Sequence, residues 1–251
     1  MMIKSFNSYV TEAKITKTKL AYHKHLNPKL WSLDDDEYVL ISDVSERMKE
    51  IANIFIDSLD IDKKYVTDII FTGSSTNFNY SELSDIDIHI IIDFDKLKGK
   101  IDPADYFNAM RSNWNLTHNI KIYDHDVELY VSDKKENLVG SAAAYSLAKD
   151  RWIQKPKQEN PKYETGHIKV KANHFAGLID RAILLHHNDK SILLELSNKI
   201  NKMRRAGLAK HGEFSLENLV FKTLRNNGYI EKLRKQINKA EDSKLNLEGL
   251  V

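Results

Sequence analysis

The residues best suited to chemistry lie between Gly73 and Asp87. An apolar run ends at Gly73, and Ser74 and Ser75 follow it directly. After a polar spacer, Asp85 and Asp87 open a second run that is rich in isoleucine. Glycine lets a backbone approach a ligand closely, serine adds hydrogen-bond donors, and a helix that began here would favour phosphate. We therefore expect Gly73, Ser74 and Ser75 to bind the phosphates of a nucleotide.

The two aspartates are expected to share one face of a strand, because side chains along a strand alternate between its faces. His89 falls on their face, and the opposite face is apolar, with isoleucine at positions 86, 88, 90 and 92. Asp85 and Asp87 would lie ~7 Å apart along the strand. No lysine or arginine lies between Lys64 and Lys96 to balance them. A divalent cation is the natural counter-charge, and oxygen ligands favour Mg²⁺ or Mn²⁺. We expect His89 to have a structural or substrate-orienting role rather than to bind the metal.

Metal-assisted phosphoryl transfer usually needs a third carboxylate from a neighbouring strand. Segments 119–123 and 127–131 alternate in polarity around a turn-like stretch, which predicts a hairpin. Glu128 lies within its second strand in an apolar setting, where a carboxylate requires a specific reason. Asp126 would share the face of Glu128 but lies at the turn. We therefore favour Glu128 as the third metal ligand.

The order and spacing of these residues resemble the nucleotidyltransferase signature of the DNA polymerase β-like superfamily. That signature has an apolar residue, Gly-Ser, a spacer, Asp-apolar-Asp and a later strand acid. A longer pattern, comprising HLNPKLW, GSSTNFNYSELSDIDIH and DVELYV, is similar to uncharacterised nucleotidyltransferase-like proteins of tailed bacteriophages and bacteria. The resemblance covers approximately residues 25–155. These enzymes often append a helical domain, so the C-terminal part matches only in that general sense.

The resemblance implies a metal-dependent enzyme that transfers a nucleoside monophosphate from an NTP to an acceptor hydroxyl and releases pyrophosphate. By this resemblance Ser74 would hold the triphosphate, and Asp85 and Asp87 would bind both metal ions. Glu128 would bind the catalytic metal and help to deprotonate the acceptor. The acceptor stays open among RNA, a nucleotide, a protein and a small molecule. One alternative is an inactive fold of this kind that serves as a nucleotide- or RNA-binding module.

The C-terminal part of the chain has helical spacing over residues 164–187, 190–210 and 215–240, the last broken near a glycine. Lys169 and Lys171 near its start could contact the triphosphate, and the alternative is a solvated helix face. A basic cluster further on could follow an RNA backbone or could equally be a solvated face. Its members are Lys199, Lys202, Arg204, Arg205 and Lys210.

A second alternative function rests on Arg181 with His186 or His187. This spacing loosely resembles the ribonuclease site of HEPN helical domains, which sometimes accompany nucleotidyltransferases. The polar residue that usually follows the arginine is Ala182 here. A HEPN-like ribonuclease is therefore the less favoured alternative.

The predicted fold class is α+β, with a small mixed β-sheet nucleotidyltransferase core, flanking helices and an all-helical C-terminal domain. Helices are expected over 43–59 and 104–115, and strands over 66–72, 85–94 and, less clearly, 142–152. We interpret the acidic run at 34–37 as a solvated loop. Pro156 and Pro161 mark the best domain boundary. The expected domains are a basic N-terminal extension (1–33), a catalytic domain (34–157) and a helical domain (160–251).

The composition excludes several classes of protein. The 251 residues include 38 Lys and Arg against 36 Asp and Glu, so charge neither requires nor forbids a nucleic-acid partner. The absence of cysteine excludes disulfides and cysteine-bound zinc and suits a reducing compartment. No apolar run approaches the ~20 residues of a transmembrane helix, and the N-terminus lacks the apolar core of a secretory signal. We expect no membrane partner and a cytoplasmic location, in the host cytoplasm if the protein is phage-encoded. The oligomeric state stays open.

Overall fold

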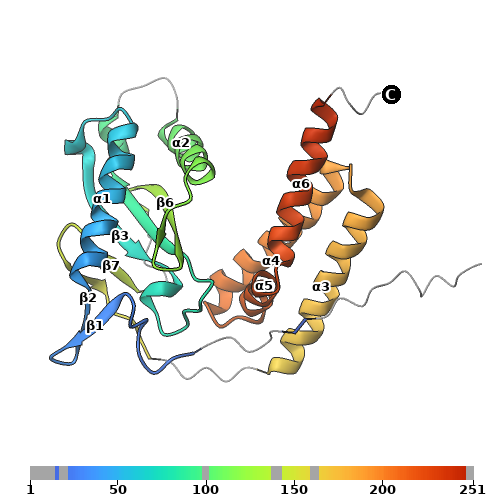
Figure 1. The fold of residues 1–251 in the computed structure, drawn as a ribbon, viewed down its shortest axis with the longest axis horizontal. Helices are drawn as coiled ribbons and strands as arrows, with labels where there is room; N and C mark the ends of the chain where they lie inside the picture. Colours follow the sequence, from blue (N-terminus) through green and yellow to red (C-terminus); the bar gives the residue numbers. More distant parts are fainter. Residues whose placement is uncertain (1–14, 17–21, 98–101, 137–142, 159–163, 247–251) are drawn as a thin grey trace, which may run out of the picture. The chain divides into compact units, whose positions relative to one another are not determined.

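The computed structural model describes residues 15–16, 22–97, 102–136, 143–158 and 164–246. The chain divides into two compact units (Figure 1). Residues 21–159 form the first, here called the α/β unit. Residues 160–251 together with 1–20 form the second, the helical unit. The α+β fold class with a helical C-terminal region is confirmed.

The α/β unit is built on a mixed sheet of six strands in the order β5-β6-β4-β3-β7-β8. Its strands are β3 (Val66–Thr72), β4 (Ile86–Ile92), β5 (Lys121–Ile122), β6 (His125–Asp133), β7 (Ala144–Ser146) and β8 (Arg151–Gln154). Strand β4 runs antiparallel to β3 but parallel to β6. Parallel neighbours require a crossover connection, and helix α2 (Pro103–Thr117) lies in the chain that joins β4 to β6. The ambiguous stretch 142–152 contains β7 and the start of β8, so its interpretation as strand is confirmed.

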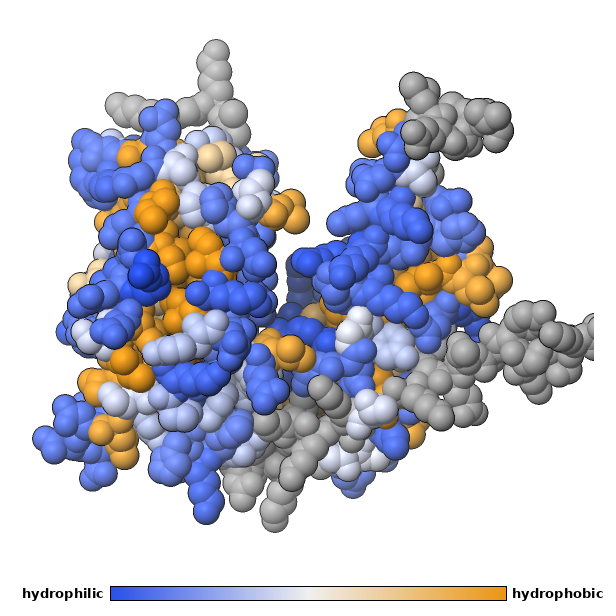
Figure 2. All heavy atoms as spheres, in the orientation of Figure 1, coloured by the Kyte–Doolittle hydropathy of each residue, from blue (hydrophilic) through white to orange (hydrophobic). Residues whose placement is uncertain are grey.

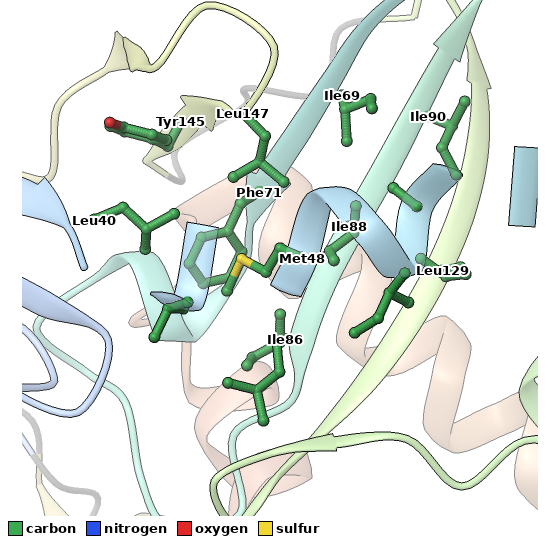
Figure 3. Packing of buried hydrophobic residues seen from close by; sticks show 14 of the residues in the cluster. Leu40, Met48, Ile69, Phe71, Ile86, Ile88, Ile90, Leu129, Tyr145 and Leu147 are labelled. Atoms are coloured by element: carbon green, nitrogen blue, oxygen red, sulfur yellow. The ribbon is translucent and has the colours of Figure 1, made fainter. Parts of the chain in front are cut away.

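Helix α1 (Ser42–Ser58) covers one face of this sheet (Figure 1). Met48 and Phe55 on its inner face are fully buried, as the 3.6-residue spacing predicts. They belong to one core cluster with Ile86 and Ile88 of β4, and Figure 3 shows Met48 beside these side chains. Each such isoleucine contributes about 1.5–3 kcal/mol by leaving water. The isoleucine face of β4 is therefore sealed against the helix, and the aspartate face is turned the other way.

Apolar residues between positions 22 and 33 belong to this core, so this part of the expected basic extension over 1–33 belongs to the α/β unit. Leu26, Leu30 and Trp31 are at most 3% exposed, and the Trp31 indole N–H donates to the Ser75 carbonyl at 2.9 Å. The rest of the expected extension, apart from residues 15 and 16, lies outside the described residues. The apolar residues of the segment HLNPKLW, rather than its lysine, hold it in the core.

The acidic run at 34–37 is exposed, as expected of a solvated loop, and its two central residues form the turn of a hairpin. Strands β1 (Trp31–Asp34) and β2 (Glu37–Leu40) pair in an antiparallel manner on either side of it. The two turn residues, Asp35 and Asp36, have φ of 42° and 64°. Aspartate tolerates this left-handed region better than most residues, and two such residues in succession match the twist of a two-residue hairpin.

Helix α2 lies along the outer edge of β6. The Asn115 side-chain amide donates to the Leu129 carbonyl and accepts from the Leu129 N–H, both at 3.1 Å. Two residues earlier on the same strand, the Val127 N–H donates to the Ile120 carbonyl at 2.9 Å. Strand β5 is too short to pair with all of β6. On this edge of β6, the backbone groups at Val127 and Leu129 are thus bonded to Ile120 and Asn115 instead.

The helical unit consists of α3 (Thr165–His186), α4 (Lys190–His211), α5 (Leu216–Asn226) and α6 (Tyr229–Leu245). Gly228, with φ of 77°, separates the last two, where the sequence predicted a break. Ile179, Ile200 and Leu224 are among its fully buried side chains. Ile15 joins this core, and its N–H donates to Asn173 Oδ1 at 3.0 Å. Polar side chains cover most of the face of this unit that is seen in Figure 2.

Candidate active site

Strand β4 presents its acids as the sequence predicted. Asp85, Asp87 and His89 are half-buried, whereas the isoleucines between them are fully buried. Asp85 lies just before the first residue of the strand, and Asp87 is its second residue. The alternation of faces is therefore confirmed, because only one face of the strand packs on the α1 core.

Glu128 lies directly opposite Asp87. In the register of the parallel pair β4–β6, Asp87 is the partner of Glu128 and His89 is the partner of Tyr130. Partners on adjacent strands are ~4.8 Å apart and project from the same face. Asp126, the weaker candidate for the third acid, is instead paired with Lys121 at 2.9 Å with its side chain 53% exposed. The structure thus brings Asp87 and Glu128 together from two separate strands.

Gly73 lies against the carboxylate of Asp87. Its φ of 93° and ψ of −163° are available to glycine and to almost no other residue. A Cβ atom built on Gly73 would lie 2.2 Å from Asp87 Oδ2. The turn between β3 and β4 can therefore pass next to the acid only because residue 73 has no side chain.

The serines after Gly73 fix the segment that leads into β4. Ser74 Oγ donates to Ser84 Oγ, and Ser75 Oγ donates to the Asp85 carbonyl, both at 2.8 Å. Ser75 is fully buried, so its hydroxyl shapes the turn, whereas Ser74 is only half-buried. The helix at this turn, η3 (Ser74–Thr76), has three residues and is of the 3₁₀ type. The phosphate affinity of a longer helix N-terminus is therefore not available here.

His125 completes this support, and the sequence analysis missed it. Its side chain is 4% exposed, and its Nδ1 is bonded to the Ser84 carbonyl at 2.8 Å. Nε2 is bonded to the side-chain amide of Asn27 at 2.9 Å. A carbonyl can only accept, so Nδ1 must carry the proton and Nε2 accepts from Asn27. The residue was interpreted as part of a polar turn, and its partners lie far away in the sequence.

Tyr130 connects the acids to a short stack of rings. Its hydroxyl donates to Glu128 Oε2 at 2.5 Å. Its ring stacks on His89 with the centroids 4.7 Å apart, and the Arg111 guanidinium lies 4.8 Å from the Tyr130 centroid. Burial raises the pKa of Tyr130 far above its ordinary value, and the charges of Asp87 and Glu128 raise it further. The phenol is therefore held protonated beside both acids.

His89 stays neutral in this environment. Burial, and to a lesser extent the charge of Arg111, lowers the pKa of His89 to about 4. Its Nδ1 lies 3.4 Å from Ser132 Oγ on β6. His89 thus contacts two residues of β6, and the structural or substrate-orienting role expected for it stays a prediction.

The donor set suits a hard divalent cation, because it consists of carboxylate oxygens. Among the described residues, however, no group of three or more His, Asp or Glu side chains is gathered closely enough to hold a metal ion. One oxygen of Glu128 is engaged by Tyr130. Asp87 and Glu128, which are neighbours in the register, with Asp85 at the strand entry, are the residues that would hold a metal here.

The other predicted contacts involve residues of the helical unit. Lys169 and Lys171 are in α3 of the helical unit, where the Lys171 ammonium is paired with Glu217 at 2.8 Å. Arg181 and His186 are exposed on the same helix. A nucleotide contact for the lysines and a ribonuclease site at Arg181 both stay predictions.

No protein-family model matches this chain, and neither a curated protein nor a solved structure with significant similarity to it is found. Within the described residues, no helix is both long and apolar enough to span a membrane.

Proposed function

We propose that the protein is a metal-dependent nucleotidyltransferase that transfers a nucleoside monophosphate from an NTP to an acceptor hydroxyl and releases pyrophosphate. One observation carries this proposal. Asp87 has a glycine turn against its carboxylate and Glu128 opposite it in the register of the sheet. A turn without a side chain at residue 73 lets the Asp87 carboxylate lie against the backbone, beside the second strand acid with which it would bind a metal.

Each residue has a defined part in the proposed reaction. Asp85, Asp87 and Glu128 would hold Mg²⁺ or Mn²⁺, which neutralises phosphate charge and makes a hydroxyl more acidic when bound. Ser74 would bind the triphosphate with its half-buried hydroxyl. Glu128 would accept the proton of the acceptor hydroxyl. The fully buried Ser75 supports the turn, and Gly73 permits the approach of the phosphates.

The acceptor belongs to one of the classes that the sequence left open, namely RNA, a nucleotide, a protein or a small molecule. We also propose a cytoplasmic location, in the host cytoplasm if the protein is phage-encoded. Support for this comes from the absence of cysteine, which suits a reducing compartment.

The proposal is tested by incubating the purified chain with each labelled NTP, Mg²⁺ or Mn²⁺, and total cellular RNA or lysate, and following the label and the release of pyrophosphate. Asp85→Ala and Asp87→Ala should each abolish label transfer while the unfolding transition is retained. Asp126→Ala, which removes an exposed acid paired with Lys121, is the matched control and should transfer label normally. If the Asp85→Ala/Asp87→Ala double variant keeps the full rate, the proposed mechanism is wrong.

The same assay separates the alternatives. A nucleotide-binding module would give heat on titration with NTP and Mg²⁺ but would release no pyrophosphate. A HEPN-like ribonuclease would cleave the RNA and lose this activity with Arg181→Ala rather than with the aspartate variants. Release of pyrophosphate that depends on Asp85 and Asp87 would support the transferase.

A further inference from the structure

Glu128 has a hydrogen-bond partner on its own strand. Glu128 and Tyr130 are two residues apart on β6 and therefore project from the same face of the sheet. The Tyr130 hydroxyl donates to Glu128 Oε2 at 2.5 Å, a distance typical of a bond to a charged oxygen. One oxygen of the carboxylate is thus committed to the phenol, and the other is left for a further ligand.

The phenol is itself fixed in place. The Tyr130 ring lies parallel to the His89 imidazole within 12°, and these residues are partners in the β4–β6 register. The Arg111 guanidinium of α2 lies over the same ring. Contacts from β4 and α2 therefore restrict the ring, so the direction from which Glu128 receives its hydrogen bond is also restricted.

We infer that Tyr130 is a positioning residue that orients Glu128 so that its second carboxylate oxygen can bind the metal ion beside Asp87. This inference rests on the proposed nucleotidyltransferase function. A carboxylate that binds a metal gains rigidity from a hydrogen bond to its other oxygen, and loss of such a partner typically costs about 10–100-fold in metal affinity. The Tyr130 hydroxyl provides that bond to Glu128 Oε2.

The inference is tested by titrating Mn²⁺ alone into the full chain by calorimetry, without nucleotide. Tyr130→Phe keeps the ring and its stacking but removes the hydroxyl, and it should weaken Mn²⁺ binding about 10–100-fold. Tyr145→Phe is the matched control. Its hydroxyl donates to Asp150 at 2.9 Å elsewhere in the same unit, so its loss should leave Mn²⁺ affinity unchanged.

The Glu128→Gln variant shows whether Tyr130 affects Mn²⁺ binding by way of the Glu128 carboxylate. In the Glu128→Gln background the additional effect of Tyr130→Phe should vanish, because the oriented carboxylate is already absent. Under turnover conditions, Tyr130→Phe should raise the metal concentration for half-maximal rate, and saturating Mn²⁺ should restore kcat. A general loss of folding would instead lower kcat at every metal concentration.

The outcomes separate the two proposals. Wild-type protein that binds no Mn²⁺ would contradict the proposed function, and the role of Tyr130 with it. If wild-type protein binds Mn²⁺ no more tightly than the Tyr130→Phe variant does, only the proposed role of Tyr130 is overturned. An equal effect of Tyr130→Phe with and without Glu128 would also overturn it.

Discussion

The carboxylate of Asp87 occupies the space in which residue 73 would otherwise carry its side chain. A Cβ on Gly73 would lie 2.2 Å from Asp87 Oδ2, in a backbone conformation with φ of 93°. Gly73→Ala should therefore displace the carboxylate and also strain the turn by about 1–3 kcal/mol. Because a misplacement of about 1 Å can cost on the order of 100-fold in rate, we expect NTP turnover to fall by at least that factor. Steady-state kinetics and urea unfolding measure the two effects.

The control for this substitution is Gly166→Ala in α3. No atom lies within 4 Å of the Cβ it would add. It should leave turnover unchanged and should not lower the free energy of unfolding, since alanine favours a helix more than glycine does. Equal turnover by Gly73→Ala and wild type would show that the close approach at Gly73 has no catalytic importance.

A second prediction concerns His125, which joins Asn27 to the segment before Asp85 through two hydrogen bonds. His125→Ala would leave the Ser84 carbonyl and the Asn27 amide without these partners inside the protein. We expect a loss of about 1–3 kcal/mol in the free energy of unfolding and a fall in turnover as this segment loosens. Thermal and urea unfolding test the first effect. His167→Ala, at a site whose side chain is 76% exposed, should change neither quantity.

His89 makes the stability of the metal-free protein depend on pH. The pKa of His89 is lowered from 6.5 to about 4 in the folded chain, so the unfolded chain binds a proton more readily between these values. The contribution of His89 to the free energy of unfolding is fully present above pH 6.5 and is lost as the pH falls toward 4. The loss should be on the order of 3 kcal/mol, with one pKa unit corresponding to about 1.4 kcal/mol.

Urea unfolding at a series of pH values, in the presence of a chelator, measures this slope. His89→Gln cannot titrate, so its unfolding free energy should fall less steeply than that of wild type between pH 6.5 and 4. Identical slopes in wild type and His89→Gln would show that the histidine is not held neutral.

The fourth prediction concerns the crossing of α4 and α5. A Cβ on Gly207 would lie 2.6 Å from Glu217 Cβ and 2.8 Å from Ser215 Oγ, the residue that caps α5. Gly207→Ala should destabilise the helical unit by about 1–3 kcal/mol, because overpacking outweighs the helix preference of alanine. Gly177→Ala in α3 meets no atom within 4 Å and should instead stabilise the protein by about 0.5–1 kcal/mol. Urea unfolding of both variants measures the two changes in the free energy of unfolding. Equal changes in the two variants would contradict the predicted overpacking at Gly207.

Periodicity in the sequence predicted those parts of the fold in which one face of an element is buried. The alternation from Asp85 to Ile92 correctly assigned the two faces of β4, because isoleucines that pack on α1 must all project from one side. The helical spacing of α3 and α4 was recognised for the same reason. The chemistry-bearing face of β6 could also be predicted, since Glu128 and Tyr130 alternate with apolar residues.

Contacts that depend on distant residues could not be predicted in this way. His125 is buried because Asn27 and Ser84 satisfy both of its nitrogens, and nothing in its immediate sequence indicates this. The hairpin at Asp35 and Asp36 was missed because a run of acids indicates solvent exposure but not the sign of φ. The register that sets Asp87 opposite Glu128 likewise depends on the crossover through α2.

The Asn115 side chain has a consequence for solubility. A primary amide carries an N–H donor and a carbonyl acceptor side by side, and Asn115 uses both groups on the backbone of Leu129. With the Val127 N–H taken by the Ile120 carbonyl, the backbone groups at these positions are not open to pairing with another chain. Exposed strand edges are templates for aggregation, and natural proteins block them in several ways. Here an asparagine on a helix takes the place of a neighbouring strand at Leu129, so the backbone next to Glu128 is already bonded.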